Sequence, residues 1–480
     1  MGGINVKRLF ISSLCFFLLT AGCEVMKAQV KPVLENDGEV FLYLQPFPQE
    51  ADRFTFEIAS ITANRIDGKE FPLTLSFATL KGTSLKRQRF FASGQLPPGQ
   101  YTGLSVKAKS AKVTADEGEA ALLVPSEPQK NEFPFEVLRK RALLLSLVYQ
   151  HSKSVQGNFS FTPVFTVSIP STTMANLIGY VSNSGANTIT VFDKQSGLVK
   201  GVIATGQRPM GIALDQTLRK AYVAFEGDDA VGIIDLLSGT IVDRIFLNGG
   251  DSPTELALTS DRKFLLTVNP GSQTVSIINT NSLVAIASVP VGEGPHSILI
   301  NRTGSRAYVF NSLSNTISVI NLSAFLTGRA VTAQAVQTIR TEPGPIFGQF
   351  SNREDKLFVL HQRSPYLTVR DPASNSLINR VYLGTGGSAI KADPQTNILY
   401  IGLAGGRDIE VHDPFTLIAG DFIPVEGEVV SMTIDNDENT LCVVVPEKRM
   451  VRIINLTSRK VISELDVDAD PYRVTLVGER

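Results

Sequence analysis

The stretch YVSNSGANTITVFD at residues 180–193 returns as YVFNSLSNTISVIN at residues 308–321. Weaker copies surround these two, and every copy ends a predicted strand on Asp or Asn. These residues are Asp193, Asp235, Asn279, Asn321, Asp371, Asp413 and Asn455, at steps of 42, 44, 42, 50, 42 and 42 residues. Seven β-type units of this length are typical of a seven-bladed β-propeller. The fold leaves the function open, because propellers serve enzymes, binders and assembly platforms alike.

The pattern inside each copy predicts how the blades are built and how the ring closes. Residues four and two positions before the terminal Asp or Asn are apolar in every copy, which is the period of a strand. Five of the seven inner strands are preceded or opened by proline: Pro209, Pro253, Pro295, Pro345 and Pro471. The repeats start on a second-type strand and end on an inner-type strand, residues 471–477. We therefore expect the C-terminal strand to complete the blade begun by residues 178–202.

These residues also carry a family resemblance. Residues 180–183 and 308–311 resemble the YVTN motif of a class of bacterial and archaeal seven-bladed propellers, and residues 187–193 and 314–321 resemble its companion strand. The resemblance covers about residues 177–480 and weakens in copies five to seven, where residues 358–361 (FVLH) keep only the outline. It implies the fold and an envelope or surface protein, without a shared activity.

The N-terminus predicts export and a membrane anchor. Lys7 and Arg8 precede an apolar run at residues 9–19, which is too short for a mature transmembrane helix. Residues 19–23 (LTAGC) resemble a bacterial lipobox, with Thr20 where Leu is usual. The resemblance implies acylation of Cys23 and attachment to a membrane of the cell envelope. Glu24, in place of Asp, favours the outer membrane, on its periplasmic side or at the cell surface. The alternative is a plain secretory signal with an incidental cysteine.

We divide the chain into a signal peptide (residues 1–22), a lipidated tether (23–38), a β-sandwich (39–168), a linker (169–176) and the propeller (177–480). The sandwich is predicted from alternating apolar runs between turn signals such as Asp67-Gly68. Residues 96–106 resemble a hairpin of immunoglobulin- or transthyretin-like sandwiches. For residues 136–148 a helix is the alternative to the strand that we favour. The predicted class is all-β throughout.

Composition and cysteine usage exclude several functions. The formal net charge is −1, so the sequence predicts no nucleic-acid partner. The chain has no Trp, and the Trp-rich repeats of quinone-dependent propeller dehydrogenases therefore have no counterpart. Of three cysteines, Cys15 leaves with the signal and Cys23 would carry lipid. The remaining Cys442 is expected to be a buried small hydrophobe without a disulfide.

No catalytic, metal or cofactor site is predicted, although a structural cation is left open. The four histidines lack metal-ligand spacing, and His412 fills a slot that is Phe, Ile or Arg elsewhere. Loops expected to share one face supply candidate partner-binding residues: Glu226, Asp228, Asp229, Glu293, His296, Glu426, Glu428, Asp468 and Asp470. The alternative is that these are solvated turn residues, offset by Arg and Lys of the same loops.

The fourth copy is longer than the others because of an insert at residues 324–337, which could be a binding loop or a tolerated elaboration. Taken together, the sequence predicts a non-catalytic, lipid-anchored envelope protein whose propeller binds a protein or a polymer. The alternative is a propeller enzyme of the lactonase or redox type.

Overall fold

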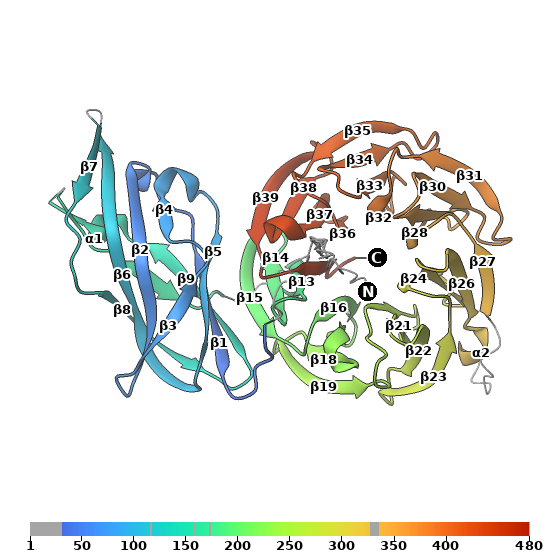
Figure 1. The fold of residues 1–480 in the computed structure, drawn as a ribbon, viewed down its shortest axis with the longest axis horizontal. Coiled ribbons are helices and arrows are strands. Elements are labelled where there is room, and N and C mark those ends of the chain that lie inside the picture. Colours follow the sequence, from blue (N-terminus) through green and yellow to red (C-terminus); the bar gives the residue numbers. More distant parts are fainter. Residues whose placement is uncertain (1–30, 116–117, 158, 172–173, 327–335, 480) are drawn as a thin grey trace, which may run out of the picture.

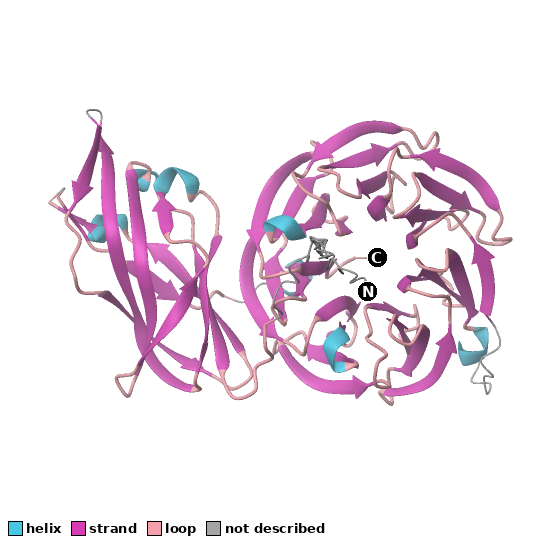
Figure 2. Ribbon diagram, in the orientation of Figure 1, coloured by secondary structure: helices cyan, strands magenta, loops and turns pink. Residues whose placement is uncertain are grey.

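The computed structural model describes residues 31–115, 118–157, 159–171, 174–326 and 336–479. It confirms the predicted all-β class, with a sandwich-like domain beside a seven-bladed propeller (Figures 1 and 2). Helical structure in the described residues is limited to short turns: α1 (His151–Ser154), α2 (Ser323–Leu326), η1 (Gln49–Ala51), η2 (Gly82–Ser84), η3 (Ala175–Leu177), η4 (Glu226–Asp228) and η5 (Pro446–Lys448). No helix in the described part of the chain has the length and apolarity needed to span a bilayer. The signal sequence and Cys23 lie outside the described residues.

The N-terminal domain is one sheet folded back on itself. Its strands are β1 (Gly38–Leu44), β2 (Phe54–Arg65), β3 (Glu70–Leu75), β4 (Thr79–Lys81), β5 (Arg89–Leu96), β6 (Gly99–Ala115), β7 (Gly118–Leu122), β8 (Gln129–Val137), β9 (Ala142–Tyr149) and β12 (Phe165–Ser168). They run in the order β12-β9-β1-β5-β3-β2-β6-β7, with β4 paired to β2 and β8 to β6. A separate small ribbon joins β10 (Val155–Gln156) and β11 (Ser160–Phe161).

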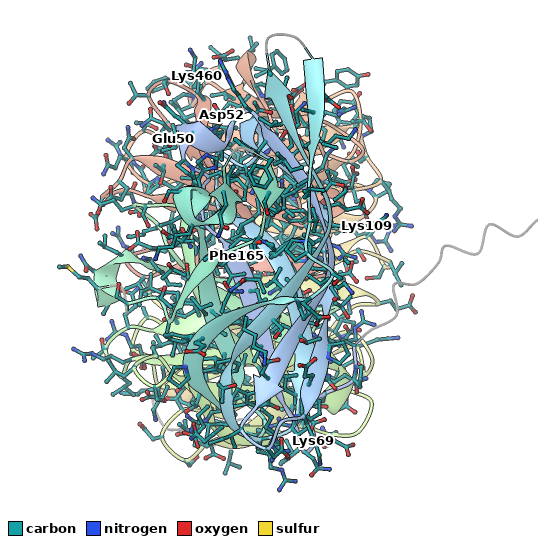
Figure 3. All side chains as sticks on the ribbon, turned by 90° about the vertical axis from the view of Figure 1, so that its left-hand side faces the viewer. Glu50, Asp52, Lys69, Lys109, Phe165 and Lys460 are labelled. Carbon is teal, nitrogen blue, oxygen red and sulfur yellow. The ribbon has the colours of Figure 1, made fainter. Side chains whose placement is uncertain are left out.

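Apolar side chains from both halves of that sheet meet in one core. Val40 of β1, Phe56 of β2 and Leu145 of β9 belong to the same buried cluster, so the domain has two layers. In Figure 3, which faces this domain, Lys69 and Lys109 lie on the outer surface, whereas Phe165 is buried. The segment proposed as either strand or helix, residues 136–148, contains the end of β8 and most of β9 and is therefore extended.

The propeller has seven four-stranded blades arranged around an axis (Figure 1). From inner to outer strand, blades 1–3 are β40 (Pro471–Leu476), β13 (Ile178–Asn183), β14 (Thr188–Asp193) and β15 (Leu198–Ala204); β16 (Pro209–Asp215), β17 (Lys220–Phe225), β18 (Ala230–Asp235) and β19 (Thr240–Phe246); and β20 (Glu255–Leu258), β21 (Phe264–Asn269), β22 (Thr274–Asn279) and β23 (Val284–Pro290).

Blades 4–7 continue in the same order. They are β24 (Pro295–Ile300), β25 (Arg306–Asn311), β26 (Thr316–Asn321) and β27 (Val336–Arg340); β28 (Pro345–Phe350), β29 (Leu357–His361), β30 (Tyr366–Arg370) and β31 (Leu377–Tyr382); β32 (Gly387–Ala392), β33 (Leu399–Leu403), β34 (Asp408–His412) and β35 (Ala419–Pro424); and β36 (Ser431–Asp435), β37 (Thr440–Val445), β38 (Met450–Asn455) and β39 (Lys460–Asp466). Most of the predicted 324–337 insert, residues 327–335, lies outside the described residues.

The ring closes as the repeat pattern predicts. The C-terminal strand β40 pairs antiparallel with β13, so the first blade combines one strand from the end of the chain with three from its beginning. A buried ion pair strengthens this seam, because Lys194 Nζ lies 2.7 Å from Asp435 Oδ2 of blade 7. The same ammonium donates a hydrogen bond to the carbonyl of Val477, just beyond β40, at 3.0 Å. One side chain thus joins the first blade, the last blade and the closing strand.

The repeated polar residues have repeated structural tasks. Asp193 accepts hydrogen bonds from the N–H groups of Gln195 and Ser196, and Asp235 bonds Leu237 and Ser238 in the same way. In this turn a short side chain bonds the backbone two residues on, which explains why each copy ends a strand on Asp or Asn. The Asn that ends the second strand donates to two hydroxyls of the third strand. The three such sets are Asn183 with Thr188 and Thr190, Asn269 with Thr274 and Ser276, and Asn311 with Thr316 and Ser318.

The N-terminal domain packs against the rim of blades 1 and 7. Phe41, Tyr43 and Leu144 share an apolar cluster with Val199 and Leu465 of the outer strands β15 and β39. Burial of such surface is the main source of stability at a contact of this kind. The predicted buried position of Cys442 is also confirmed, since its free thiol lies in this cluster. Burial raises the pKa of that thiol.

Polar contacts set the register of this interface. Asp466, at the end of β39, accepts hydrogen bonds from Arg87 at 2.6 Å, Arg89 at 2.7 Å and the N–H of Phe90 at 3.1 Å. The amide of Gln88 bonds both the N–H and the carbonyl of Val199, at 2.8 and 3.2 Å. Gln88 therefore replaces a neighbouring strand at the open edge of β15.

Candidate functional site: the axial cavity and the two faces of the propeller

The antiparallel strands of each blade place its connections alternately on two faces of the ring. We call one the tether face: it carries the connections between second and third strands and those between blades. Lys31, where the described chain begins, donates its N–H to Gly185 on this face at 2.9 Å. The other, the cavity face, carries the connections between first and second strands and between third and fourth strands.

The predicted partner-binding residues lie at the tether face, and several of their carboxylates bond the loops there. Asp229 accepts the N–H groups of Gly250 at 2.8 Å and Ser252 at 2.7 Å. Asp228 accepts the N–H of Gln207 and a guanidinium hydrogen of Arg244, both at 3.1 Å. These carboxylates hold neighbouring connections together within and between blades 2 and 3.

Several of the other predicted carboxylates contact different partners around the ring. Their contacts are Glu226 with Arg208 at 2.9 Å, Glu426 with Arg452 at 2.9 Å, Glu428 with the N–H of Gly405 at 3.0 Å and Asp468 with the N–H of Ala469 at 2.9 Å. Hydrogen bonding to Arg452 holds the pKa of Glu426 below its usual value. Glu293 and Asp470 contribute main-chain carbonyls that accept the N–H groups of Leu313 and Ser184. Their role in binding a partner stays a prediction.

Each propeller histidine has its own local partners. His361 contacts Thr341 at 2.9 Å and the carbonyl of Tyr366 at 3.1 Å, and burial lowers its pKa to about 4. His412 contacts Glu410 at 2.7 Å and the carbonyl of Leu417 at 2.9 Å. Among the described residues, no three His, Cys, Asp or Glu side chains form a group that could hold a metal ion.

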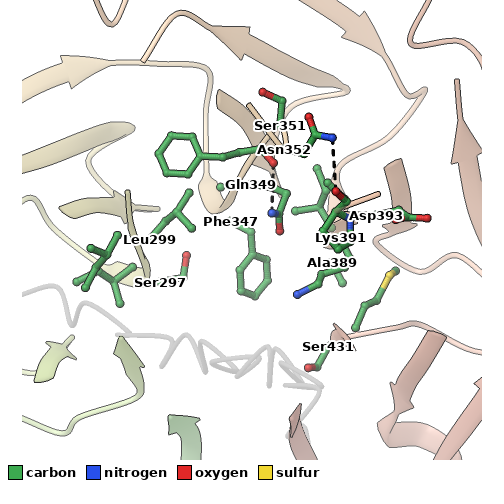
Figure 4. Close-up of a pocket in the computed structure, with 18 of the residues that line it drawn as sticks. Ser297, Leu299, Phe347, Gln349, Ser351, Asn352, Ala389, Lys391, Asp393 and Ser431 are labelled. Atoms are coloured by element: carbon green, nitrogen blue, oxygen red, sulfur yellow. Dashed lines mark hydrogen bonds between the residues drawn. The ribbon is translucent and has the colours of Figure 1, made fainter. Parts of the chain in front are cut away.

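A cavity of about 860 Å³ lies on the propeller axis (Figure 4). Its walls are residues of the inner strands that point toward the axis at alternate positions, such as Phe347 and Gln349 of β28 and Ala389 and Lys391 of β32. The loops in its lining come from the cavity face: Gln216, Arg302, Asn352, Gln395 and Asn436. We therefore place its mouth on that face. Sequence reasoning missed the cavity, although period-two alternation in the inner strands could have indicated axis-facing residues.

Two charge pairs lie at the cavity. Glu255 Oε1 lies 3.7 Å from a guanidinium nitrogen of Arg473, and Lys391 Nζ lies 2.5 Å from Glu479 Oε1. Burial raises the pKa of Glu255, while the Glu255 carboxylate raises the pKa of Arg473. For Glu479, burial would raise the pKa, but the Lys391 ammonium outweighs it and the pKa is lowered. Arg302, Glu354, Asp393 and Asp437 also line the cavity, so its polar walls carry more carboxylates than cations.

An aromatic ring and neutral polar groups complete the walls. Phe347 is held edge-on by the imidazole of His296, with 5.0 Å between ring centroids. His296 Nδ1 lies 3.1 Å from the carbonyl of Ile346, and burial lowers the pKa of this histidine to about 4. The imidazole of His296 is therefore neutral near pH 7. Gln349 and Ser297 lie beside Phe347, and the cavity therefore offers an aromatic surface next to hydrogen-bonding groups (Figure 4).

Comparison with known proteins supports the fold alone. No protein-family model and no curated protein matches the chain. Similar solved structures include a chain of the Kuenenia stuttgartiensis hydrazine synthase (TM-score 0.51, 18% identity, 58% of this chain and 93% of that one). A functionally unknown protein from Desulfotomaculum acetoxidans has a TM-score of 0.55 and 14% identity, over 62% of this chain and 98% of that one. A proposed 6-phosphogluconolactonase from Bacteroides fragilis has a TM-score of 0.54 and 16% identity, over 64% of this chain and 99% of that one. At these identities the likeness shows the propeller architecture and not an activity.

Proposed function

We propose that this chain is a lipid-anchored bacterial envelope protein whose propeller is a non-catalytic binding platform for a protein or a polymer. The anchor is supported by the apolar run at residues 9–19 and the LTAGC sequence ending at Cys23. Placement in the YVTN class is supported by the motif at residues 180–183 and 308–311, and an immunoglobulin- or transthyretin-like origin of the sandwich by residues 96–106.

The observation that carries the binding role is the composition of the axial cavity. Two charge pairs, Glu255–Arg473 and Lys391–Glu479, are formed within the protein, and further charged residues of both signs line the cavity. Beside these charges the wall offers Phe347, the amide of Gln349 and the hydroxyl of Ser297, which donates to the carbonyl of Ile346 and can still accept a hydrogen bond. This combination of an aromatic surface, hydrogen-bonding groups and charged residues suits a polar segment, such as a loop of a protein or the end of a polymer.

Capture from native envelopes tests the platform. We expect the lipidated protein to retain a specific partner, and Phe347→Ala with Gln349→Ala to lower its recovery at least tenfold. Phe415→Ala is the matched control, because Phe415 is an exposed phenylalanine of blade 6 outside the cavity lining. Equal recovery by both variants would contradict the cavity as the binding site.

The anchor is tested separately by Cys23→Ala. This change removes the only thiol that the lipobox pattern offers for acylation, so we expect the protein to move from the membrane fraction to the soluble fraction. Membrane retention equal to that of the wild type would contradict the lipid anchor.

A second candidate function, an enzyme of the lactonase or redox type, is favoured by one observation. Glu255 is buried, its pKa is raised, and its Oε1 atom has no hydrogen-bond partner although it lines the cavity beside Arg473. Carboxyls with a raised pKa in a cavity are candidates for acid–base catalysis. Lactone hydrolysis by the purified protein, lost in Glu255→Gln, would establish this function and overturn the non-catalytic one.

A further inference from the structure

The start of the described chain is fixed to the tether face of the propeller. The N–H of Lys31 bonds the carbonyl of Gly185, and the carbonyl of Lys31 accepts a hydrogen bond from the side chain of Asn187. The Lys31 ammonium pairs with the buried carboxylate of Glu39 in β1. Main-chain bonds in both directions make this attachment a defined anchor point.

The following residues are held by the N-terminal domain. Arg139 donates to the carbonyl of Glu35 at 3.0 Å and to the side chain of Asn36 at 2.7 Å. The chain between Lys31 and β1 therefore lies along the junction of the two domains. The described chain therefore begins at the tether face, beside this junction.

The length of that tether is limited by covalent geometry. Cys23 precedes Lys31 by eight residues. A fully extended chain spans at most about 3.3–3.6 Å per residue, which gives roughly 29 Å as the greatest reach between them. A lipid on Cys23 therefore keeps Gly185 and its neighbouring loops within about this distance of the bilayer surface.

The mouth of the cavity lies on the face of the propeller opposite to Lys31. An inner strand such as β24 has six residues, which corresponds to about 20 Å between the two faces before the loops are added. The shortest way around the rim from Lys31 passes blades 1 and 7, and there the N-terminal domain covers β15 and β39 through Gln88 and Asp466. On this route an eight-residue tether would spend about 20 Å of its roughly 29 Å reach on the distance between the faces, before the loops and the N-terminal domain are added.

We propose that the tether face of the propeller is turned toward the lipid bilayer and that the axial cavity opens away from it. This orientation rests on the proposed acylation of Cys23. The loops of this face carry acidic residues such as Asp228, Glu428 and Asp470, which anionic headgroups repel. The tether, and not adhesion of the face, therefore sets the orientation, and the cavity is presented to partners on the side away from the membrane.

Energy transfer from the two faces to the bilayer tests the orientation. Ser272 on the tether face and Ser282 on the cavity face are both exposed and both belong to blade 3, which makes them a matched pair. Each is changed to Cys in the full-length lipidated protein, labelled with a fluorescent donor and reconstituted into vesicles whose headgroups carry an acceptor. Cys442 is buried and does not compete for the label. We expect at least twofold higher transfer from Ser272→Cys than from Ser282→Cys.

The possible failures are distinguishable. Equal transfer from the two positions, or higher transfer from Ser282→Cys, would overturn the orientation and leave the anchor intact. If mass spectrometry of the purified protein finds no acyl group on Cys23, the anchor and the orientation are overturned together. Partner capture by the variant with Phe347→Ala and Gln349→Ala reports on the cavity alone, and it tests neither the anchor nor the orientation.

Discussion

The two faces of the propeller use charged residues in different ways. On the tether face, carboxylates such as Asp229 and Glu428 bond the backbone of neighbouring loops and hold those loops in place. On the cavity face, Asp193 and Asp235 also bond the backbone of their turns, but here charged side chains pair between blades as well, as Lys194 does with Asp435 and Lys391 with Glu479. The first arrangement stabilises each loop locally. The second joins residues far apart in the sequence and leaves an open space on the axis between them.

The largest effect is expected from the seam on the cavity face. Lys194→Met leaves the buried Asp435 without its cation, and breaking a buried pair in this way costs about 3–5 kcal/mol of unfolding free energy. Chemical denaturation of the purified variant measures this loss. Adding Asp435→Asn removes the unpaired charge and should recover part of the loss. A cost below about 1 kcal/mol for Lys194→Met would show that the pair does not hold the seam.

A second effect concerns acid stability near the tether face. His361 has a pKa of about 4 in the folded protein against an ordinary 6.5, so the unfolded state binds the proton more readily between these values. The contribution of His361 to the free energy of unfolding is complete above pH 6.5. It is lost as the pH falls toward 4, by up to about 3 kcal/mol. His296 shares this shift and should add a similar slope.

His361→Asn separates the two histidines. Asparagine fills the equivalent position in Asn183 and Asn311, and it could bond the hydroxyl of Thr368, which has no hydrogen-bond partner. We expect the variant to fold and to lose the part of the stability change between pH 6.5 and 4 that His361 contributes, up to about 3 kcal/mol, measured by urea unfolding at several pH values. An unchanged pH dependence would show that His361 is not the titrating group.

The smallest effect is expected for a single loop of the tether face. Asp229→Ala removes two hydrogen bonds and places alanine at a φ of 49°, which together should cost about 2 kcal/mol. Asp229→Asn keeps an acceptor oxygen and tolerates this backbone conformation, so its cost should be below about 1 kcal/mol. Urea unfolding compares the two. Equal costs would show that the charge, and not the geometry, stabilises the loop.

Much of the architecture was predictable because it repeats. A feature seen seven times, such as the turn at Asp193 or Asn455, separates structural positions from special ones. Comparison of equivalent positions therefore correctly indicated that Cys442 is a buried packing residue. It also indicated the closing strand, because the repeats begin and end on different strand types.

The candidate site was less predictable because it depends on residues that do not repeat. Gln88 bonds Val199 across 111 residues of sequence, and no local pattern marks either residue. The cavity walls come from inner strands of different blades, where Phe347, Lys391 and Arg473 share no motif. Similarly, the acidic loops could be assigned to one face by strand count, but their individual hydrogen-bond partners could not.

The sequence by itself determined the seven blades, the all-β class and the manner of ring closure, because strand period and turn chemistry are local and recur in every copy. Only the tertiary structure decided where the tether is fixed, which rim the N-terminal domain covers and on which face the cavity opens. These features arise from contacts between side chains distant in the chain, such as Asp466 with Arg87 and Arg89. Their geometry exists only once the ring has closed.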